Sequence, residues 1–509
     1  MKFKSSNIGL SPSVFIREEY FGGILFNAGT GTMIDVDREA YSLMLLIKNM
    51  GIVDVNDIDI IYGRHIDRKK VNRIVEKLLA LNMLSVMPQG ILNKNNYDIL
   101  HERSQCIIKW PSAQHISAPE TVHWAVTFKC DSDCPDCYIR RHRYKLAAEL
   151  ETKQALEIVG KVADARVFQL AIGGGEPFLR DDIGNIVAGA HERNLVVHIT
   201  TGRYQHDPGV IRTISKYVKS MQIGIKHEQL ADHPENEKEK LSKLLYLFGE
   251  NGIDVGSNLV VSHSTIYQFD RIVELLSTVG FKRITLLRYK PPGDINRWMK
   301  EKPDEEDLLE FERKLLKVVG TYPQIQFRVD CGLTFLERKL PSQKAVQFGI
   351  RGCTAGDRIL SIAPDGSVFP CSQLVGDQFH AGNLLEDNLK NIWINSNVLR
   401  KYRKFRCSKP FKAGQCGQCA AKTHCGGCRV FADDTLGADP GCPDPVLLPS
   451  KRSKHRNDDL YDTILDIQES IGCTAGGFPY ATFEEIKGWL EEENYRDYPR
   501  WLIRSIMDK

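Results

Sequence analysis

The feature that most constrains this chain is a group of three closely spaced cysteines, Cys130, Cys134 and Cys137. Their C-x3-C-x2-C spacing can hold three irons of a 4Fe–4S cube and leave the fourth iron without a protein ligand. Short cysteine groups also bind structural zinc, so the spacing alone does not choose the metal. In both cases the loop must fold around a metal site. In the iron–sulfur case, the iron without a protein ligand is a position where a substrate or cofactor can bind.

A second motif, Gly174-Gly175-Glu176-Pro177, follows the cysteines along the chain. Residues 166–172, just before it, alternate between apolar and polar types as a strand does. Glycines directly after a strand allow backbone groups to approach a ligand closely. The motif therefore predicts a ligand contact at the end of a strand.

In this order the two motifs resemble those of the radical S-adenosylmethionine (SAM) enzymes. The resemblance implies that the amino and carboxylate groups of SAM chelate the open iron, and that an electron cleaves the sulfonium to a 5′-deoxyadenosyl radical. It also implies that Gly174, Gly175 and Glu176 meet the methionyl amino group. One residue departs from the family pattern: Asp136 stands where an aromatic residue or His usually packs against adenine. Tyr138 is the candidate substitute, or else an ordinary packed aromatic.

A second group of cysteines lies far downstream and resembles a SPASM domain, which carries two auxiliary iron–sulfur clusters. In that pattern Cys353 is followed by twelve residues, Gly366, four more residues and Cys371, with Pro364-Asp365-Gly366 predicting a hairpin turn. The resemblance assigns the first cluster to Cys353, Cys371 and Cys428, and the second to Cys416, Cys419, Cys425 and Cys442.

The first auxiliary cluster has only three clear ligands in this pattern. Either Cys331 or Cys407 supplies a fourth, or the cluster keeps an open iron that would bind a substrate thiolate; both cysteines can also be buried, inert thiols. Two structural zincs are the alternative for the distal group as a whole. Iron analysis under anaerobic conditions separates these alternatives.

Between the cysteine groups, strand-like and helix-like stretches alternate, as in an α/β protein with a partial (β/α)6 TIM-type barrel whose chemistry lies at the strand C-termini. A helix is predicted over residues 154–162. The predicted strands are 125–128, 166–172, 195–200, 221–225, 255–261 and 284–287.

Several polar residues at the predicted strand ends are candidate site residues. The radical SAM resemblance places Thr200 and Thr201 near the ribose of SAM and Ser257 or Asn258 near its carboxylate, with simple strand-end capping as the alternative. Candidate catalytic residues are less well defined. They are Lys226 and Arg288, each of which can pair with a carboxylate of SAM or of a peptide or be an ordinary solvated cation, and Cys473 as a hydrogen donor.

The first hundred residues bear on the substrate class. Strands are predicted over 14–16, 23–26 and 33–36, followed by a helix capped by Asp37 and a later helix over 71–79. Three strands and helices make a winged-helix-like module, and its residues 21–26 are similar to the peptide-recognition domain of the pyrroloquinoline-quinone chaperone type. The resemblance implies capture of a precursor's leader by β-augmentation. Winged helices also bind DNA, but this module has no strong basic stripe.

The predicted organisation has five parts: residues 1–95 for leader recognition, 96–120 as a linker, 121–325 as the barrel, 326–445 as the SPASM domain and 446–509 as a helical extension. A formal net charge of +3 gives no reason to expect nucleic acid as a partner. The N-terminal residues contain no signal peptide and the sequence has no long apolar run, so a cytoplasmic location without membrane association is expected.

The sequence thus predicts a radical SAM enzyme with SAM, one SAM-binding 4Fe–4S cluster and two auxiliary 4Fe–4S clusters as cofactors. Its expected partners are a ribosomally made precursor peptide and a flavodoxin, ferredoxin or reductase as electron donor. A thioether or carbon–carbon crosslink is the first expectation for the product. Peptide epimerisation, backbone excision, and a small-molecule or haem-pathway substrate are the alternatives.

Overall fold

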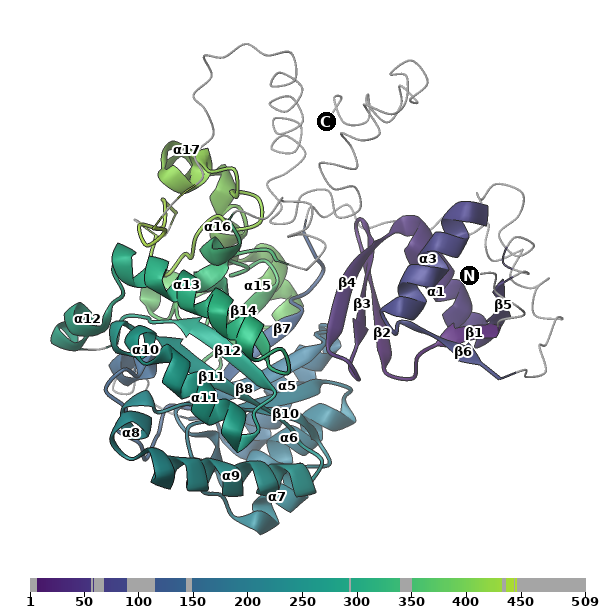
Figure 1. Ribbon diagram of the computed structural model, residues 1–509. Coiled ribbons are helices and arrows are strands. Elements are labelled where there is room, and N and C mark those ends of the chain that lie inside the picture. Colours follow the sequence, from purple (N-terminus) through teal and green to yellow (C-terminus); the bar gives the residue numbers. More distant parts are fainter. Residues whose placement is uncertain are drawn as a thin grey trace. The chain divides into compact units, whose positions relative to one another are not determined.

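The computed structural model describes residues 7–55, 58, 68–88, 115–142, 149–292, 294–338, 350–432, 436–443 and 445. The chain separates into two compact units between Ser117 and Ala118, a boundary inside the predicted linker (Figure 1). Cys473 and the predicted C-terminal extension lie outside the described residues. Within the described ranges, no helix is both long enough and apolar enough to cross a membrane.

The N-terminal unit contains two three-stranded antiparallel sheets and two helices. The predicted strands are confirmed as the sheet β2-β3-β4, and the predicted helices as α1 and α3. The second sheet, β5-β1-β6, was not predicted from the sequence because its strands are short. The elements are β1 (Asn7–Leu10), β2 (Val14–Glu19), β3 (Gly22–Asn27), β4 (Thr32–Asp37), α1 (Arg38–Met50), β5 (Ile52–Asp54), α3 (Arg68–Ala80) and β6 (Leu84–Met87).

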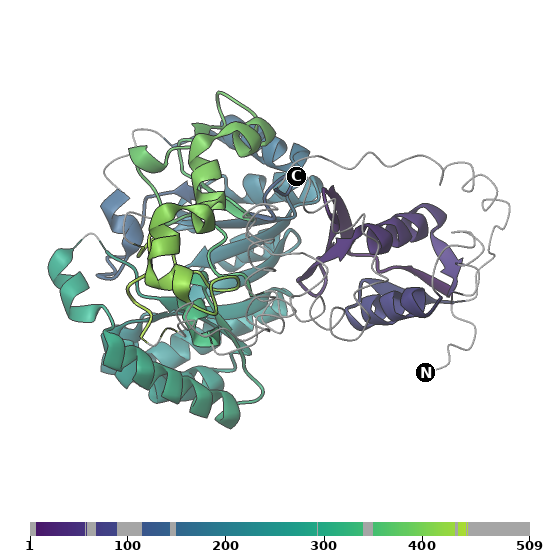
Figure 2. The ribbon, with the colours of Figure 1, turned by 90° about the horizontal axis from the view of Figure 1, so that it is seen from above.

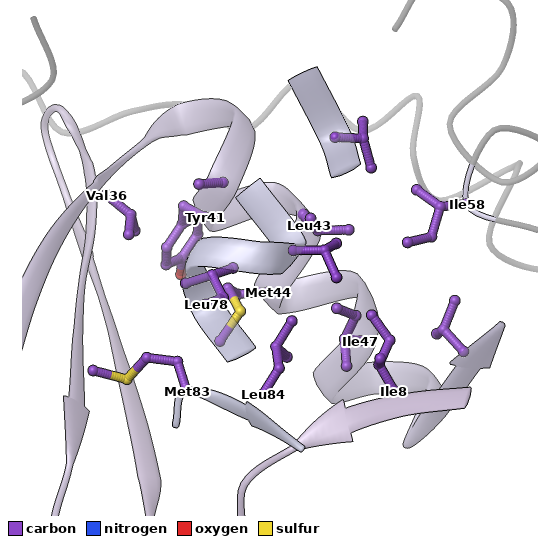
Figure 3. Packing of buried hydrophobic residues seen from close by; sticks show 14 of the residues in the cluster. Ile8, Val36, Tyr41, Leu43, Met44, Ile47, Ile58, Leu78, Met83 and Leu84 are labelled. Carbon is purple, nitrogen blue, oxygen red and sulfur yellow. The ribbon is translucent and has the colours of Figure 1, made fainter. Parts of the chain in front are cut away.

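Helix α1 begins where Asp37 accepts a hydrogen bond from the Ala40 amide, as predicted for a capping residue. Its apolar face packs with α3 and the strands around Tyr41, Met44 and Ile47, which are buried (Figure 3). A Cβ on Gly23 would lie 2.2 Å from the Tyr41 ring. Gly23 therefore lets the helix pack closely on the sheet.

The second unit is built on a ten-stranded sheet in the order β13-β12-β11-β10-β9-β8-β7-β14-β15-β16. The six predicted strands are confirmed as the parallel strands β7–β12, so the prediction of a partial barrel is also confirmed. Parallel β13 and β14 extend it at its two edges. The bounds are β7 (Thr121–Thr127), β8 (Gln169–Gly174), β9 (Val196–Thr201), β10 (Val218–Gly224), β11 (Asp254–Val261), β12 (Arg283–Arg288) and β13 (Gln326–Val329).

Helices lie along the outside of this curved sheet (Figure 1). Each contributes an apolar face; in α5, for example, Ala155, Ile158, Val159 and Val162 are buried. The bounds are α5 (Thr152–Asp164), α6 (Ile183–Glu192), α7 (Pro208–Ile214), α8 (His227–Asp232), α9 (Pro234–Glu250), α10 (His263–Tyr267), α11 (Phe269–Val279), α12 (Ile295–Glu301) and α13 (Glu305–Thr321).

The cysteine-rich lobe continues the barrel sheet, because β14 pairs in parallel with β7. The predicted turn joins β14 to antiparallel β15, and Gly366 has a φ of 85° there, which favours glycine. Figures 1 and 2 both show this lobe lying over one end of the barrel. Its elements are β14 (Ile359–Ile362), β15 (Ser367–Phe369), β16 (Gly382–Asn383), α15 (Leu389–Asn395), α16 (Asn397–Arg403) and α17 (Lys409–Ala413).

Candidate functional site

The first three cysteines lie on the loop that leaves the C-terminal end of β7. Cys134 and Cys137 line a cavity of about 560 Å³ at this end of the barrel. The loop is held at its start by Asp131, which accepts a hydrogen bond of 2.8 Å from Nε of Arg203. Strand C-termini are where barrel enzymes place their chemistry, so the cavity is the candidate active site.

The glycine motif packs against the start of this cysteine loop. The Gly175 amide donates to the Thr127 carbonyl at 2.8 Å, and the Glu176 amide donates to the Lys129 carbonyl at 2.9 Å. A Cβ on Gly175 would lie 2.1 Å from that Lys129 oxygen, and Gly174 has a φ of 109°. The glycines are thus required for close packing between β8 and the cysteine loop, a role that the sequence did not reveal.

The Glu176 carboxylate faces into the protein. It accepts hydrogen bonds from Oγ1 of Thr201 at 2.9 and 3.0 Å and from the Gly202 amide at 3.1 Å. Burial raises the pKa of this carboxyl above its ordinary value, while the hydrogen bonds oppose the shift. The Thr201 hydroxyl is therefore committed to Glu176, and both side chains hold the ends of β8 and β9 together.

Strand alternation separates the remaining predicted SAM contacts into two groups. Thr200 is exposed, and Asn258 lies on the same face of β11 as Val260, which lines the cavity. Ser257 is fully buried on the opposite face, where its hydroxyl donates to the Arg283 carbonyl at 3.4 Å. Thr200 and Asn258 therefore remain accessible candidates, whereas Ser257 packs away from the cavity.

Lys226 and His227 line the cavity at the end of β10. The Lys226 ammonium lies 3.5 Å from Oγ of Ser132 and 5.3 Å from the Tyr204 ring centroid. His227 is buried, and its Nε2 atom has no hydrogen-bond partner among the described residues. Burial lowers the pKa of His227, which keeps the ring neutral. The cavity thus offers one cation and one neutral imidazole to a ligand.

Asp136, the residue that departs from the family pattern, forms a bidentate ion pair with Arg297 on α12. Its oxygens accept from Nε at 2.7 Å and from Nη2 at 2.8 Å, and a third bond of 2.8 Å comes from the Tyr289 hydroxyl. Burial opposes ionisation, but these bonds hold the pKa of Asp136 below its usual range. Asp136, which stands where the family pattern has an aromatic residue or His, therefore links the cysteine loop to α12 through this ion pair.

Asp136, His227 and Glu228 are close enough together to suggest a metal site. However, Nη2 of Arg297 bonds both carboxylates, with a distance of 2.6 Å to Glu228. Nη1 also lies 3.6 Å from Glu301. The guanidinium of Arg297 supplies the positive charge that a metal ion would otherwise provide. These side chains therefore form an ion-pair network and not a metal site.

Replacing Arg297 with methionine should lower the free energy of unfolding by about 2 kcal/mol, because it leaves partly buried carboxylates without a counter-charge. Thermal denaturation of anaerobic protein at a fixed scan rate measures this. The matched control is Arg313→Met, which breaks the exposed pair with Glu310 and should leave the stability close to that of the wild type. Equal midpoints for the two variants would contradict the role given to Arg297.

Tyr138 lines the same cavity and also faces the cysteine-rich lobe. Burial raises the pKa of its hydroxyl to about 12, and the nearby Ser372 opposes this shift. It packs with a hydrophobic cluster that includes Phe128 of the barrel and Phe369 of the lobe. Its predicted contact with adenine stays a prediction.

The cysteines assigned to the first auxiliary cluster lie together, and Cys331 lies with them. The nearby thiols of Cys353 and Cys428 raise the pKa of Cys331 well above its ordinary value. Cys371 is within electrostatic range of the same two thiols, and burial raises its pKa to about 12. Thiolates in such a buried place need the positive charge of a metal. Cys407, in contrast, is disulfide-bonded.

The cysteines assigned to the second auxiliary cluster line one hollow in the lobe. The Asp439 amide donates to Sγ of Cys416 at 3.3 Å, and the Ala421 amide donates to Sγ of Cys419 at 3.4 Å. Amide donors to sulfur are a feature of iron–sulfur sites. The donor set fits a cluster; the four cysteines in the hollow are Cys416, Cys419, Cys425 and Cys442.

Arg288 does not line the cavity. Its guanidinium pairs with the Asp439 carboxylate at 2.7 and 3.2 Å and lies 3.7 Å from the Phe431 ring centroid. Asp439 also accepts from the Cys428 amide at 2.9 Å. Arg288 therefore joins the end of β12 to the cysteine-rich lobe. The carboxylate of Asp439 neutralises the positive charge of Arg288 in this buried pair.

Two residues that shape the site escaped the sequence analysis, Arg297 and Asp439. Of these, Asp439 lies three residues before Cys442. Proximity to a cysteine was the only available signal. It did not reveal the partner of either residue, because those partners are distant in the chain.

Comparison with known proteins agrees with this geometry. Residues 124–276 match the Radical SAM superfamily, and residues 353–420 match the iron–sulfur cluster-binding domain called SPASM. Mycofactocin maturase MftC of Mycobacterium tuberculosis is 28% identical over 67% of this chain and 89% of that protein. PqqA peptide cyclase of Granulibacter bethesdensis is 26% identical over 62% and 85%.

Two further similarities bear on the fold and on the function. AdoMet-dependent heme synthase of Methanosarcina barkeri is 24% identical over 66% of this chain and 99% of that protein. The crystal structure of Streptococcus suis SuiB bound to S-adenosylmethionine matches with a TM-score of 0.62 and 20% identity, over 86% of this chain and 99% of SuiB. The two domains imply SAM, a SAM-binding 4Fe–4S cluster and auxiliary clusters as cofactors. This chain therefore contains a Radical SAM domain followed by a SPASM iron–sulfur cluster-binding domain.

Proposed function

We propose that this enzyme modifies a ribosomally synthesised precursor peptide. The N-terminal unit binds the leader, the barrel holds SAM and the core peptide at the cavity, and the SPASM lobe supplies auxiliary clusters beside it. When bound, SAM and its cluster supply a 5′-deoxyadenosyl radical, which abstracts hydrogen from an unactivated C–H bond. A thioether or a carbon–carbon crosslink is the product that we place first.

The observation that carries this proposal is the N-terminal unit. Strands β2 and β4 each pair on one side only within the described residues, so each leaves an edge to which a leader strand can add. The fold match to SuiB covers 86% of the chain, more than the barrel and lobe alone. SuiB has also been solved bound to its precursor peptide SuiA. The relatives named mycofactocin maturase and PqqA peptide cyclase support the same substrate class.

The residues at the cavity support a division of roles. Cys130, Cys134 and Cys137 would hold the SAM-binding cluster, with main-chain atoms of Gly174–Glu176 near the methionyl amino group. Thr200 and Asn258 keep accessible side chains for SAM. The Lys226 ammonium would pair with a carboxylate of SAM or of the peptide.

The test is to search the neighbouring reading frames for a short precursor, co-express it with the enzyme and analyse the peptide by mass spectrometry. We expect a loss of two hydrogens for each crosslink, localised to the core peptide by fragmentation. An unchanged peptide together with rapid SAM cleavage would contradict the proposal and favour a small-molecule or haem-pathway substrate. The similarity to AdoMet-dependent heme synthase is the reason to test for that alternative.

We also propose that Cys331 is the fourth ligand of the first auxiliary cluster, with Cys353, Cys371 and Cys428. The nearness of its thiol to those of Cys353 and Cys428, which raises its pKa, supports this assignment. Cys407 is engaged in a disulfide and is not a free thiolate.

Replacing Cys331 with alanine should change the Mössbauer and electron paramagnetic resonance (EPR) spectra of one auxiliary cluster and leave SAM cleavage intact. Cys407→Ala is the matched control and should leave the iron content unchanged. Should Cys407→Ala lose iron while Cys331→Ala keeps all clusters, the fourth ligand would be Cys407.

A further inference from the structure

His227, the first residue of helix α8, lines the cavity at the end of β10. The residue is only 6% exposed, and its Nε2 atom has no hydrogen-bond partner among the described residues. Buried polar atoms in proteins are nearly always bonded, so each exception calls for an explanation such as a catalytic role or a bound water. The imidazole is therefore available to a molecule that enters the cavity.

The carboxylates that line the same cavity are not available in this way. Each of them is paired with an arginine, which favours the ionised form and makes the carboxylate a weaker base. Lys226, beside His227, is an ammonium and has no lone pair that could accept a proton. Apart from the cysteines proposed as cluster ligands, His227 is therefore the described cavity residue best able to accept a proton. The pairs are Asp131 with Arg203, Asp133 with Arg140, and Asp136 and Glu228 both with Arg297.

The charges around His227 suit a ring that holds a proton briefly. Burial lowers the pKa of His227; the carboxylates of Asp136, Glu228 and Glu301 raise it, and Arg297 lowers it. These charged groups come from the cysteine loop, α8 and α12. Because the net shift of the pKa is downward, the ring is neutral before the reaction. The three carboxylates then stabilise the imidazolium that forms when the ring accepts a proton.

A crosslink removes two hydrogens from the peptide, and they leave in different forms. The first is abstracted as a hydrogen atom by the 5′-deoxyadenosyl radical, which leaves a carbon radical on the peptide. That carbon then bonds to a sulfur or carbon atom of a second peptide group, whose own bond to hydrogen breaks. This second hydrogen departs as a proton and an electron, and the electron passes to an auxiliary 4Fe–4S cluster as the one-electron oxidant. The proton needs a base close to the reacting atoms.

We infer that His227 is the catalytic base that accepts this proton as the crosslink forms. A neutral imidazole has one ring nitrogen with a free lone pair, and it becomes an imidazolium when it accepts the proton. The imidazolium returns the proton to solvent before the next turnover. The inference rests on the proposed crosslinking function, but it does not depend on which peptide group is attacked.

The test compares His227→Gln with the wild type, as anaerobic holoenzymes acting on the precursor identified from the neighbouring reading frames. Glutamine keeps a hydrogen-bonding amide but accepts no proton. Crosslinking, measured by mass spectrometry, should fall roughly 10²-fold, while 5′-deoxyadenosine formed without peptide should stay at the wild-type yield. Freeze-quench EPR should show a peptide radical that accumulates in the variant, because the step that consumes the radical is slow. His233→Asn, an exposed histidine just after α8, is the matched control and should behave as the wild type.

The pH profile separates a base from a structural role. Wild-type crosslinking should rise as the pH increases through the pKa of His227, since only the neutral ring can accept a proton. Because this pKa lies below its usual value, the loss of rate should appear only at acidic pH. His227→Gln should lack this dependence, whereas a structural fault would lower the rate equally at every pH.

Three outcomes would overturn the inference. The first is wild-type crosslinking by His227→Gln, or the same pH profile in that variant. The second is an equal loss of 5′-deoxyadenosine without peptide, which would make His227 a contact of SAM. The third is loss of iron from the variant, which would place His227 in a metal site. Failure of the proposed function has a different signature, because the wild type itself would then leave the peptide unmodified.

Discussion

Replacing Cys134 with alanine should abolish the formation of 5′-deoxyadenosine from SAM. Three cysteines on the β7 loop are the only protein ligands proposed for the SAM-binding cluster, so loss of one leaves the iron site incomplete. Without the open iron, the amino and carboxylate groups of SAM have no metal to chelate. Chromatography of anaerobic reactions with dithionite measures the product, which should fall to the level of a sample without protein.

The matched control for this variant is Cys416→Ala, in the hollow assigned to the second auxiliary cluster. It should also lose one cluster's iron, yet continue to form 5′-deoxyadenosine. The contrast shows that cleavage depends on which cluster is lost and not on total iron. Wild-type yields from Cys134→Ala would remove the basis of every proposal made for the cavity.

Deleting residues 1–117 should uncouple SAM cleavage from peptide modification. These residues form a compact unit with its own hydrophobic core, so their removal cuts the chain at a natural boundary. A leader bound to this unit raises the effective concentration of the core peptide, and loss of that tether should lower the rate of modification by roughly 10²-fold. Mass spectrometry of the peptide and chromatography of 5′-deoxyadenosine, run on the same reactions, measure the two rates.

The truncated protein carries its own control, because continued formation of 5′-deoxyadenosine shows that the barrel is folded. Binding of a fluorescent leader peptide should be lost in parallel. A truncated enzyme that modifies the peptide at the full rate would show that the N-terminal unit has another role. That result would favour a reaction in which the leader is not recognised.

Local patterns in the sequence were sufficient for most of the architecture. Strand alternation predicted β7–β12, and the i, i+3, i+4 spacing of apolar residues predicted α1 and α3, because both signals repeat within a few residues. The short strands β1, β5 and β6 carry too few residues to show a period. The helix cap at Asp37 and the turn at Gly366 were found because each depends on local backbone chemistry.

The glycine motif and Arg288 show where local reasoning was incomplete. GGEP was interpreted as a ligand contact, and its glycines prove to pack against the cysteine loop. Arg288 was a candidate catalytic residue, but its guanidinium forms an ion pair with the carboxylate of Asp439, 151 residues further along the chain. Nothing in the spacing around either position indicates the partner, since a contact between distant residues leaves no periodic signal.

By itself, the sequence determined the chemistry of this protein: thiolates at short, characteristic intervals specify iron–sulfur sites, and the order of the motifs specifies a radical SAM barrel followed by a cysteine-rich lobe. Only the tertiary structure decided which distant residues lie beside those cysteines. It brought Cys331 close to Cys353 and Cys428, and Arg297 to Asp136. Metal-ligand spacing within a loop is set by local geometry, whereas these contacts join segments far apart in the chain and arise only when the barrel and the lobe fold.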